Sequence, residues 1–200
     1  MIYAVIFVEQ INNTHLINQT SIQYDQAINK CREIFIKKNN DYGTSWRVMR
    51  LSSITDQIFI KAQRLKTIEL KGEQKIGDDE ISEYIGIINY CLIGLIQMEL
   101  KESTEMDLNI KELSVLYDQY IVSTKKLMEE KNHDYGEAWR DMRVSTFTDM
   151  ILMRLLRIKQ IEDSKGKTIM SEGVDANLQD MINYSVFALI QLDEQKNSKK

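Results

Sequence analysis

The chain has 200 residues, no proline and only eight glycines, so it contains few residues that break helices. This composition favours an all-α fold over a fold that contains a sheet. The formal net charge of −4 argues against non-specific binding of nucleic acid, which needs a positive surface, but it allows a local cation cluster to hold a small anion.

Residues 1–20 are expected to form an N-terminal extension, either a short strand or an added helix. Their start, MIYAVIFV, is apolar but lacks the basic residues and the cleavage site of a signal peptide. The sequence has no run of 18 apolar residues, so we expect no membrane span. Cys31 and Cys91 lack metal-type spacing, and we expect them to be reduced core residues of a cytoplasmic protein.

The rest of the chain is a tandem duplication. Tyr24-Asp25-Gln26 recurs 93 positions later, and about 20 residues between positions 24 and 69 are identical in the second copy. The longest shared polar segment is Lys-Asn-x-Asp-Tyr-Gly, which begins at Lys38 and again at Lys131. We therefore predict one helical repeat over residues 21–102 and a second over residues 110–196.

Each repeat is predicted to fold into three helices. The first helix ends at Asp-Tyr-Gly, where glycine can adopt the left-handed conformation that often ends a helix. The third helix is rich in Ile, Leu and Tyr and should lie in the core. The expected ranges are about 22–39, 53–70 and 79–101 in repeat 1, and about 110–132, 146–163 and 174–193 in repeat 2. Two such repeats predict an all-α bundle with pseudo-two-fold symmetry.

The Asp-Tyr-Gly-x-x-Trp-Arg-x-Met-Arg segment is a candidate nucleotide site. Tyr and Trp can stack on a base, and paired Arg side chains can hold phosphate. The alternative is structural, with the aromatic residues covering the core and the arginines bridging to aspartates. The candidate residues are Asp41, Tyr42, Trp46, Arg47 and Arg50 in repeat 1, and Asp134, Tyr135, Trp139, Arg140 and Arg143 in repeat 2.

The second helices carry a carboxylate followed by two cations. Helical spacing puts the carboxylate and the cations on neighbouring parts of one face, which suits Mg²⁺ and a phosphate chain. The alternative is that Ser53 and Thr146 begin capping boxes, in which the aspartate only caps its own helix. The residues are Asp56, Lys61 and Arg64 in repeat 1, and Asp149, Arg154 and Arg157 in repeat 2.

The third helices carry polar residues at three-residue spacing within an apolar stripe. Combining the copies gives Glu-x-x-Asp-x-x-Asn-Tyr, in which Glu83 comes from one copy and Asp180 from the other. One hypothesis is a composite site. The other is a hydrogen bond from Asn89 and Asn183 to Asn or Tyr across the interface between the repeats.

These motifs together resemble the nucleotide modification associated domain 1 family (DUF1599), which is identified by Lys-Asn-x-Asp-Tyr-Gly-x-x-Trp-Arg-x-Met-Arg, Thr-Asp and Ile-Asn-Tyr. The resemblance covers nearly everything after residue 20, and members of that family commonly carry the domain twice. It implies a link to nucleotide modification without defining a reaction.

A weaker resemblance is to all-α nucleoside triphosphate pyrophosphohydrolases of the MazG and dimeric dUTPase type. It implies Mg²⁺ held by Asp56, Glu83, Asp149 and Asp180. We therefore expect a nucleotide-related protein, with a Mg²⁺-dependent nucleotide (pyro)phosphohydrolase as the first hypothesis. The alternative is a non-catalytic module that binds a nucleotide or a protein. The expected ligand is a nucleotide or nucleoside phosphate, and formation of a homodimer is left open.

Overall fold

The computed structural model describes residues 2–72, 79–100, 103, 105–164 and 173–198, with side chains from residue 19 onward. Six α-helices and two short 3-10 turns make up this part of the chain, and it contains no strand. The elements are α1 (Ile2–Tyr42), η1 (Ser45–Val48), α2 (Leu51–Lys71), α3 (Glu80–Glu99), α4 (Ile110–Tyr135), η2 (Ala138–Asp141), α5 (Val144–Asp163) and α6 (Val174–Asn197).

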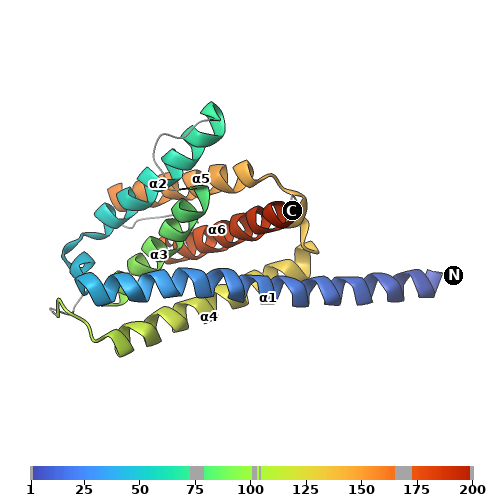
Figure 1. The fold of residues 1–200 in the computed structure, drawn as a ribbon, viewed down its shortest axis with the longest axis horizontal. Helices are drawn as coiled ribbons and strands as arrows, with labels where there is room; N and C mark the ends of the chain where they lie inside the picture. Colours follow the sequence, from blue (N-terminus) through green and yellow to red (C-terminus); the bar gives the residue numbers. More distant parts are fainter. Residues whose placement is uncertain (1, 73–78, 101–102, 104, 165–172, 199–200) are drawn as a thin grey trace.

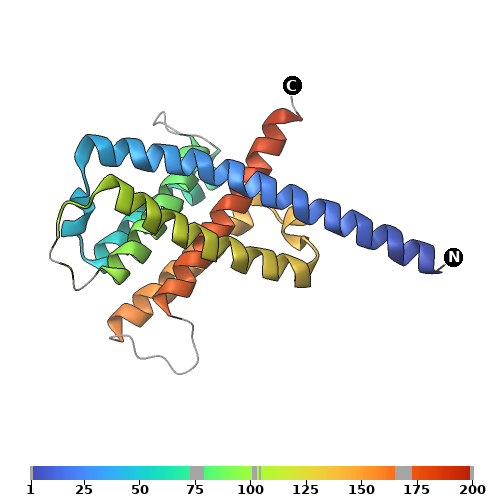
Figure 2. The same cartoon turned by 90° about the horizontal axis from the view of Figure 1, so that it is seen from below.

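The two repeats pack as equivalents around a pseudo-two-fold axis. Each helix contacts its own counterpart: α1 packs on α4, α2 on α5, and α3 on α6. Figure 1 shows the resulting layers, with α3 and α6 between the α2–α5 pair and the α1–α4 pair. Figure 2 shows the α1–α4 face, where the two helices lie side by side in front of α6. The predicted all-α tandem fold is confirmed.

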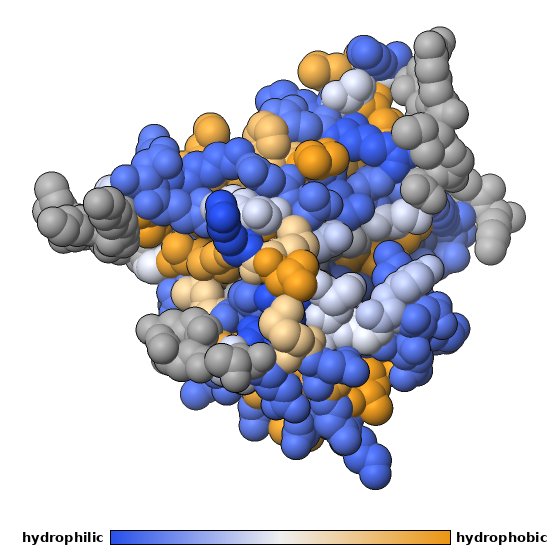
Figure 3. Space-filling view, turned by 90° about the vertical axis from the view of Figure 1, so that its left-hand side faces the viewer, coloured by the Kyte–Doolittle hydropathy of each residue, from blue (hydrophilic) through white to orange (hydrophobic). Residues whose placement is uncertain are grey.

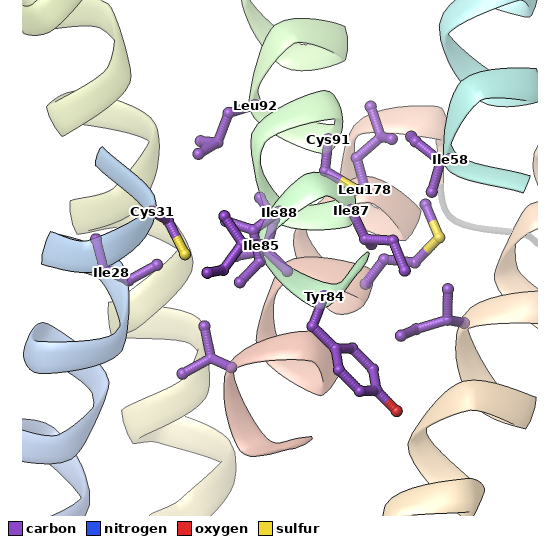
Figure 4. Close-up of a cluster of buried hydrophobic side chains, with 14 of the residues drawn as sticks. Ile28, Cys31, Ile58, Tyr84, Ile85, Ile87, Ile88, Cys91, Leu92 and Leu178 are labelled. Atoms are coloured by element: carbon purple, nitrogen blue, oxygen red, sulfur yellow. The ribbon is translucent and has the colours of Figure 1, made fainter. Parts of the chain in front are cut away.

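The core lies on α3 and α6, as their apolar sequences predict. Figure 4 shows Ile87, Ile88 and Cys91 of α3 among side chains that include Ile28 of α1 and Ile58 of α2. Helix α3 is long and apolar enough to cross a membrane, but 67% of its most apolar window is buried inside the bundle. Its composition is therefore that of a central core helix.

Glycine ends the first helix of each repeat as predicted. Gly43 and Gly136 have φ of +60° and +59°, and their N–H groups donate to Asn39 and Asn132 at 2.9 Å. The left-handed conformation favours glycine because a Cβ is disfavoured there. The chain then turns through η1 or η2 into the second helix, which brings the repeated Trp-Arg segment against the core.

Three expected helix starts differ from the structure. Helix α1 begins at Ile2, so the backbone of the N-terminal extension continues the first helix of repeat 1, and Figure 1 shows it projecting beyond the bundle. The second helices begin at Leu51 and Val144, two residues before the predicted positions. The N-cap residues of these two helices are Arg50 and Arg143, and neither side chain caps its helix with a hydrogen bond.

Candidate functional site

The two aspartates predicted for the second helices face the opposite repeat. Asp56 pairs with Lys159 at 2.8 Å, and Asp149 pairs with Lys66 at 3.1 Å. These four residues are equivalent under the repeat, so one ion pair is made twice across the α2–α5 contact. Both aspartates are largely exposed. This arrangement fits neither the capping-box hypothesis nor a magnesium site to which both aspartates contribute.

The threonines that precede these aspartates also bind the opposite repeat. Thr55 donates to Glu162 at 2.9 Å, and Thr148 donates to Glu69 at 2.6 Å. Burial raises the pKa of both glutamates above the ordinary carboxyl value. The Thr-Asp motif therefore joins the repeats. It can do so because α2 packs on its equivalent α5, so that each motif faces the other repeat.

The four carboxylates expected to hold magnesium do not converge. Glu83 and Asp180 are buried, but each lies in its own repeat with its own cations. Among the residues that the structure describes, no group of three or more His, Cys, Asp or Glu side chains could hold a metal ion. The hypothesis of a composite site is not supported either, because Glu83 and Asp180 each pair with two cations of their own repeat. The side chains present do not fit a metal centre held by protein ligands alone.

Repeat 1 contains a cavity of about 490 Å³ beside Glu83. The carboxylate of Glu83, which is 5% exposed, pairs with Lys61 at 3.3 Å and with the guanidinium of Arg64. Helices α1, α2 and α3 and the turn η1 form the walls. The lining residues are Ile34, Phe35, Lys38, Asn39, Tyr42, Gly43, Ser45, Trp46, Gln57, Lys61, Ser82, Glu83, Ile85, Gly86, Asn89, Tyr90 and Ile93.

Charge and aromatic surface meet in this cavity. Two lysines and one carboxylate line it, so its lining carries net positive charge on a chain that is acidic as a whole. Tyr42 stands at its rim with 72% of its surface exposed, whereas Trp46 is buried and donates its indole N–H to Asn39 at 3.1 Å. Figure 3 shows the end of the molecule where α1 ends, with hydrophobic patches set in a hydrophilic surface. We call this cavity the repeat 1 pocket.

Repeat 2 arranges the equivalent residues differently. The carboxylate of Asp180 is 2% exposed and pairs with Lys131 at 2.7 Å and Arg154 at 2.6 Å. The ring of Trp139 stacks on Phe187, with centroids 4.3 Å apart and planes 8° from parallel. In repeat 2 the equivalent charged groups thus form ion pairs with Asp180, and the equivalent tryptophan ring is covered by Phe187.

The two predicted asparagines hold the repeats together. Nδ2 of Asn89 donates to the carbonyl of Cys31 at 3.1 Å, and Nδ2 of Asn183 donates to that of Thr124 at 3.2 Å. Each Oδ1 accepts from a tyrosine of the other repeat. The structural hypothesis, an Asn–Tyr hydrogen bond across the interface, is the arrangement found. Asn89 also lines the repeat 1 pocket, but its amide is already bonded.

Two arginines predicted to bind phosphate are structural instead. Arg47 is 7% exposed and donates to Gln97 and to the carbonyls of Leu100, Ser103 and Glu105 at 2.6–3.2 Å. Arg140 donates to Glu137 at 2.7 Å, to Gln23 of α1 at 2.8 Å and to Glu194 of α6 at 3.1 Å. Both guanidinium groups are thereby committed to holding the fold.

The other predicted residues lie on the surface. Asp134 is exposed and contacts its neighbour His133, and Tyr135 is 73% exposed. The remaining exposed candidates are Asp41, Arg50, Arg143 and Arg157. Only Tyr42 among these surface residues lines the repeat 1 pocket.

Three sets of residues that shape the site were not among the predicted site residues. Lys38 and its counterpart Lys131 begin the longest shared polar segment, so their signal was visible. Gln97 and Gln191 also recur, and each donates to backbone carbonyls of the preceding Trp-Arg-x-Met turn. Gln57 lines the pocket but is Met150 in the second repeat, so the repeat gives no signal for it.

The two cysteines are core residues, as predicted. Both are free and buried, and burial raises the pKa of Cys31 to about 12. A thiol with such a pKa stays protonated near neutral pH, which makes it a poor nucleophile. Cysteine chemistry is therefore no part of the site.

The fold and the pocket define a class: an all-α tandem-repeat protein, in which equivalent helices pair across a pseudo-two-fold axis and one repeat holds a cationic, aromatic-lined cavity. A sequence model of the DUF1599 family, described as nucleotide modification associated domain 1, matches residues 38–98 and 131–192. The chain belongs to this family and carries its domain twice. Comparisons with curated proteins and with solved structures gave no significant match.

Proposed function

We propose that this protein recognises a nucleoside phosphate in the repeat 1 pocket. The proposal rests on one observation: two lysines and two aromatic residues line the same cavity. They are Lys38, Lys61, Tyr42 and Trp46. Its volume of about 490 Å³ lies within the range usual for small-molecule sites. Association of the family with nucleotide modification, as its name states, supports the same class of ligand.

Each part of such a ligand meets suitable chemistry. Ammonium groups attract phosphate strongly where walls of low dielectric constant exclude water. Tyr42 is exposed at the rim and free to turn its ring toward a base, and stacking on an aromatic side chain contributes about 1–3 kcal/mol per base. A base at the rim with its phosphate deeper in the pocket uses both features together.

We propose recognition rather than hydrolysis because the pocket offers few acidic groups. Glu83 is the one carboxylate among its described lining residues, and that carboxylate already pairs with Lys61 and Arg64. Protein sites for magnesium and phosphate usually supply one or two carboxylates free to bind the metal. Magnesium binding and hydrolysis remain predictions, which are tested by adding Mg²⁺ and measuring phosphate release.

The test is calorimetric titration with a panel of nucleoside mono-, di- and triphosphates, the matching nucleosides, and pyrophosphate. A nucleotide that binds more tightly than both its nucleoside and pyrophosphate is the expected result. Tyr42→Ala should lower that affinity by at least fivefold, whereas the matched variant Tyr135→Ala in repeat 2 should leave it unchanged. Absence of nucleotide binding, or an equal loss in both variants, would refute the proposal. Phosphate release that requires Mg²⁺ and is lost in Glu83→Gln would replace recognition with catalysis.

A further inference from the structure

The two repeats differ at one position that decides what fills the pocket. Gly86 of α3 and Asp180 of α6 occupy equivalent places, three residues before the shared Asn-Tyr pair. The carboxylate of Asp180 is held by Lys131 and Arg154, at 2.7 and 2.6 Å. Repeat 2 therefore carries its own anion, bound between two cations and shielded from water.

The cations around that anion have equivalents in repeat 1. Lys131 corresponds to Lys38, and Arg154 corresponds to Lys61, both at an offset of 93 residues. Lys38 and Lys61 line the repeat 1 pocket, but Gly86 places no carboxylate between them. Lys61 also pairs with Glu83, one turn earlier on α3, at 3.3 Å. At the place of Gly86 itself, however, repeat 1 supplies no carboxylate, so the pocket keeps the two cations without the anion that lies between their equivalents in repeat 2.

The absence of a side chain at Gly86 matters sterically. A Cβ there would lie 2.6 Å from Cε and 2.9 Å from Nζ of Lys61, so Lys61 rests directly against the bare backbone. Any side chain at this position would move the lysine. Glycine at position 86 therefore preserves the volume of the pocket and the present position of the Lys61 ammonium group.

A second difference fills repeat 2 further. Phe187 of α6 stacks on Trp139 and is 8% exposed. Its equivalent Ile93 lines the repeat 1 pocket next to Trp46, with a smaller and non-planar side chain. Trp46 lines the pocket in repeat 1, whereas Phe187 covers the ring of the equivalent Trp139 in repeat 2.

We infer that each chain binds one anionic group, in repeat 1, between Lys38 and Lys61, at the place equivalent to the Asp180 carboxylate in repeat 2. Repeat 2 is an internally filled copy that binds no such ligand. For a nucleoside phosphate this group is a phosphate, and that identification rests on the proposed function. The anion site itself follows from the equivalence of the two repeats.

The first experiment is titration of the full chain with pyrophosphate and with the nucleotide panel, measuring stoichiometry. One ligand per chain is expected. Lys38→Ala should lower the affinity at least tenfold, whereas its matched variant Lys131→Ala should change it less than twofold. Two ligands per chain, or a loss of affinity caused by Lys131→Ala, would overturn the inference.

The second experiment rebuilds repeat 2 chemistry in repeat 1. Gly86→Asp should place a carboxylate between Lys38 and Lys61, keep the fold, and lower pyrophosphate affinity at least tenfold. Gly86→Ala is the control for the displacement of Lys61, since its methyl group meets the flexible end of that lysine but adds no negative charge, and it should lower the affinity much less than Gly86→Asp does. Equal affinities of the two Gly86 variants would contradict an anion site there.

The two proposals fail in different ways. If pyrophosphate binds once per chain with these variant effects but no nucleotide binds more tightly, the anion site stands and nucleotide recognition falls. If neither pyrophosphate nor any nucleotide binds, both fall.

Discussion

The hydroxyl of Tyr24 in repeat 1 donates a hydrogen bond of 3.0 Å to Oδ1 of Asn183 in repeat 2. The equivalent bond runs the other way, from Tyr117 in repeat 2 to Asn89 in repeat 1, at 3.2 Å. Burial raises the pKa of both tyrosines, so both hydroxyls remain donors at all ordinary pH values. These buried bonds explain why Tyr and Asn recur in both copies, because each needs its partner from the other repeat.

Tyr24→Phe and Tyr117→Phe should each destabilise the protein by about 1–3 kcal/mol, because each leaves a buried Asn oxygen without its donor. Denaturant unfolding measures the change. Tyr120→Phe is the control, since its hydroxyl bonds to exposed Glu99, and it should cost less than about 1 kcal/mol. If all three variants unfold at the same denaturant concentration, the cross-repeat bonds do not hold the interface.

The exchanged ion pairs of Asp56 and Asp149 predict a different result. Both pairs are exposed, so Asp56→Asn and Asp149→Asn should each cost less than about 1 kcal/mol. Neither variant should alter ligand affinity in the repeat 1 pocket, since both aspartates face the opposite second helix. A loss of Mg²⁺-dependent binding or turnover in either variant would restore the magnesium role predicted from sequence.

Arg47 should contribute stability rather than ligand affinity. Its guanidinium holds Gln97 and three carbonyls beyond the end of α3, so Arg47→Ala should destabilise the protein by about 3 kcal/mol. Arg50→Ala removes an exposed arginine from the same turn and should change stability by less than about 0.5 kcal/mol. Thermal unfolding of both variants gives the comparison. A larger effect of Arg50→Ala on nucleotide affinity than on stability would instead support its predicted phosphate role.

The sequence was sufficient to predict the helices and their duplication, because helix periodicity and self-similarity are local or directly visible in the chain. The Asn–Tyr bond was also within reach, since a recurring amide in an apolar stripe needs a partner. The partner of Asp56 could not be predicted. Lys159 lies 103 residues away, and only the packing of α2 on α5 brings the two together.

The candidate site, too, could be predicted only in part from the sequence. Glu83 and Asp180 were predicted as magnesium ligands, and both are buried in ion pairs with lysine and arginine. The sequence placed them in different repeats but could not show that each pairs with cations of its own repeat, because complementary losses in two copies fit either a shared site or two divergent ones. The geometry of Lys131 and Arg154 around Asp180 favours divergence.

The threonine-bound glutamates Glu69 and Glu162 predict how stability depends on pH. Burial is the main cause that raises the pKa of each glutamate, and neighbouring acids add to it. The threonine hydrogen bond and, to a smaller extent, Lys66 or Lys159 oppose this rise in pKa. A carboxyl whose pKa is raised on folding binds more protons in the native state. Its stabilising contribution is therefore present below the ordinary pKa of about 4.3 and is lost as pH rises through the raised value.

The double variant Glu69→Gln/Glu162→Gln should match the wild type at acid pH and become more stable than it near neutral pH. Solvent screening keeps that gain below about 1 kcal/mol. Glu33→Gln should behave in the opposite sense, because a hydrogen bond from Lys37 lowers the pKa of Glu33 and its stabilisation is present above the ordinary pKa. Thermal unfolding from pH 3.5 to 8 measures both trends. Parallel curves for the double variant and the wild type would show that the Thr-bound carboxyls titrate as freely in the folded protein as in the unfolded chain.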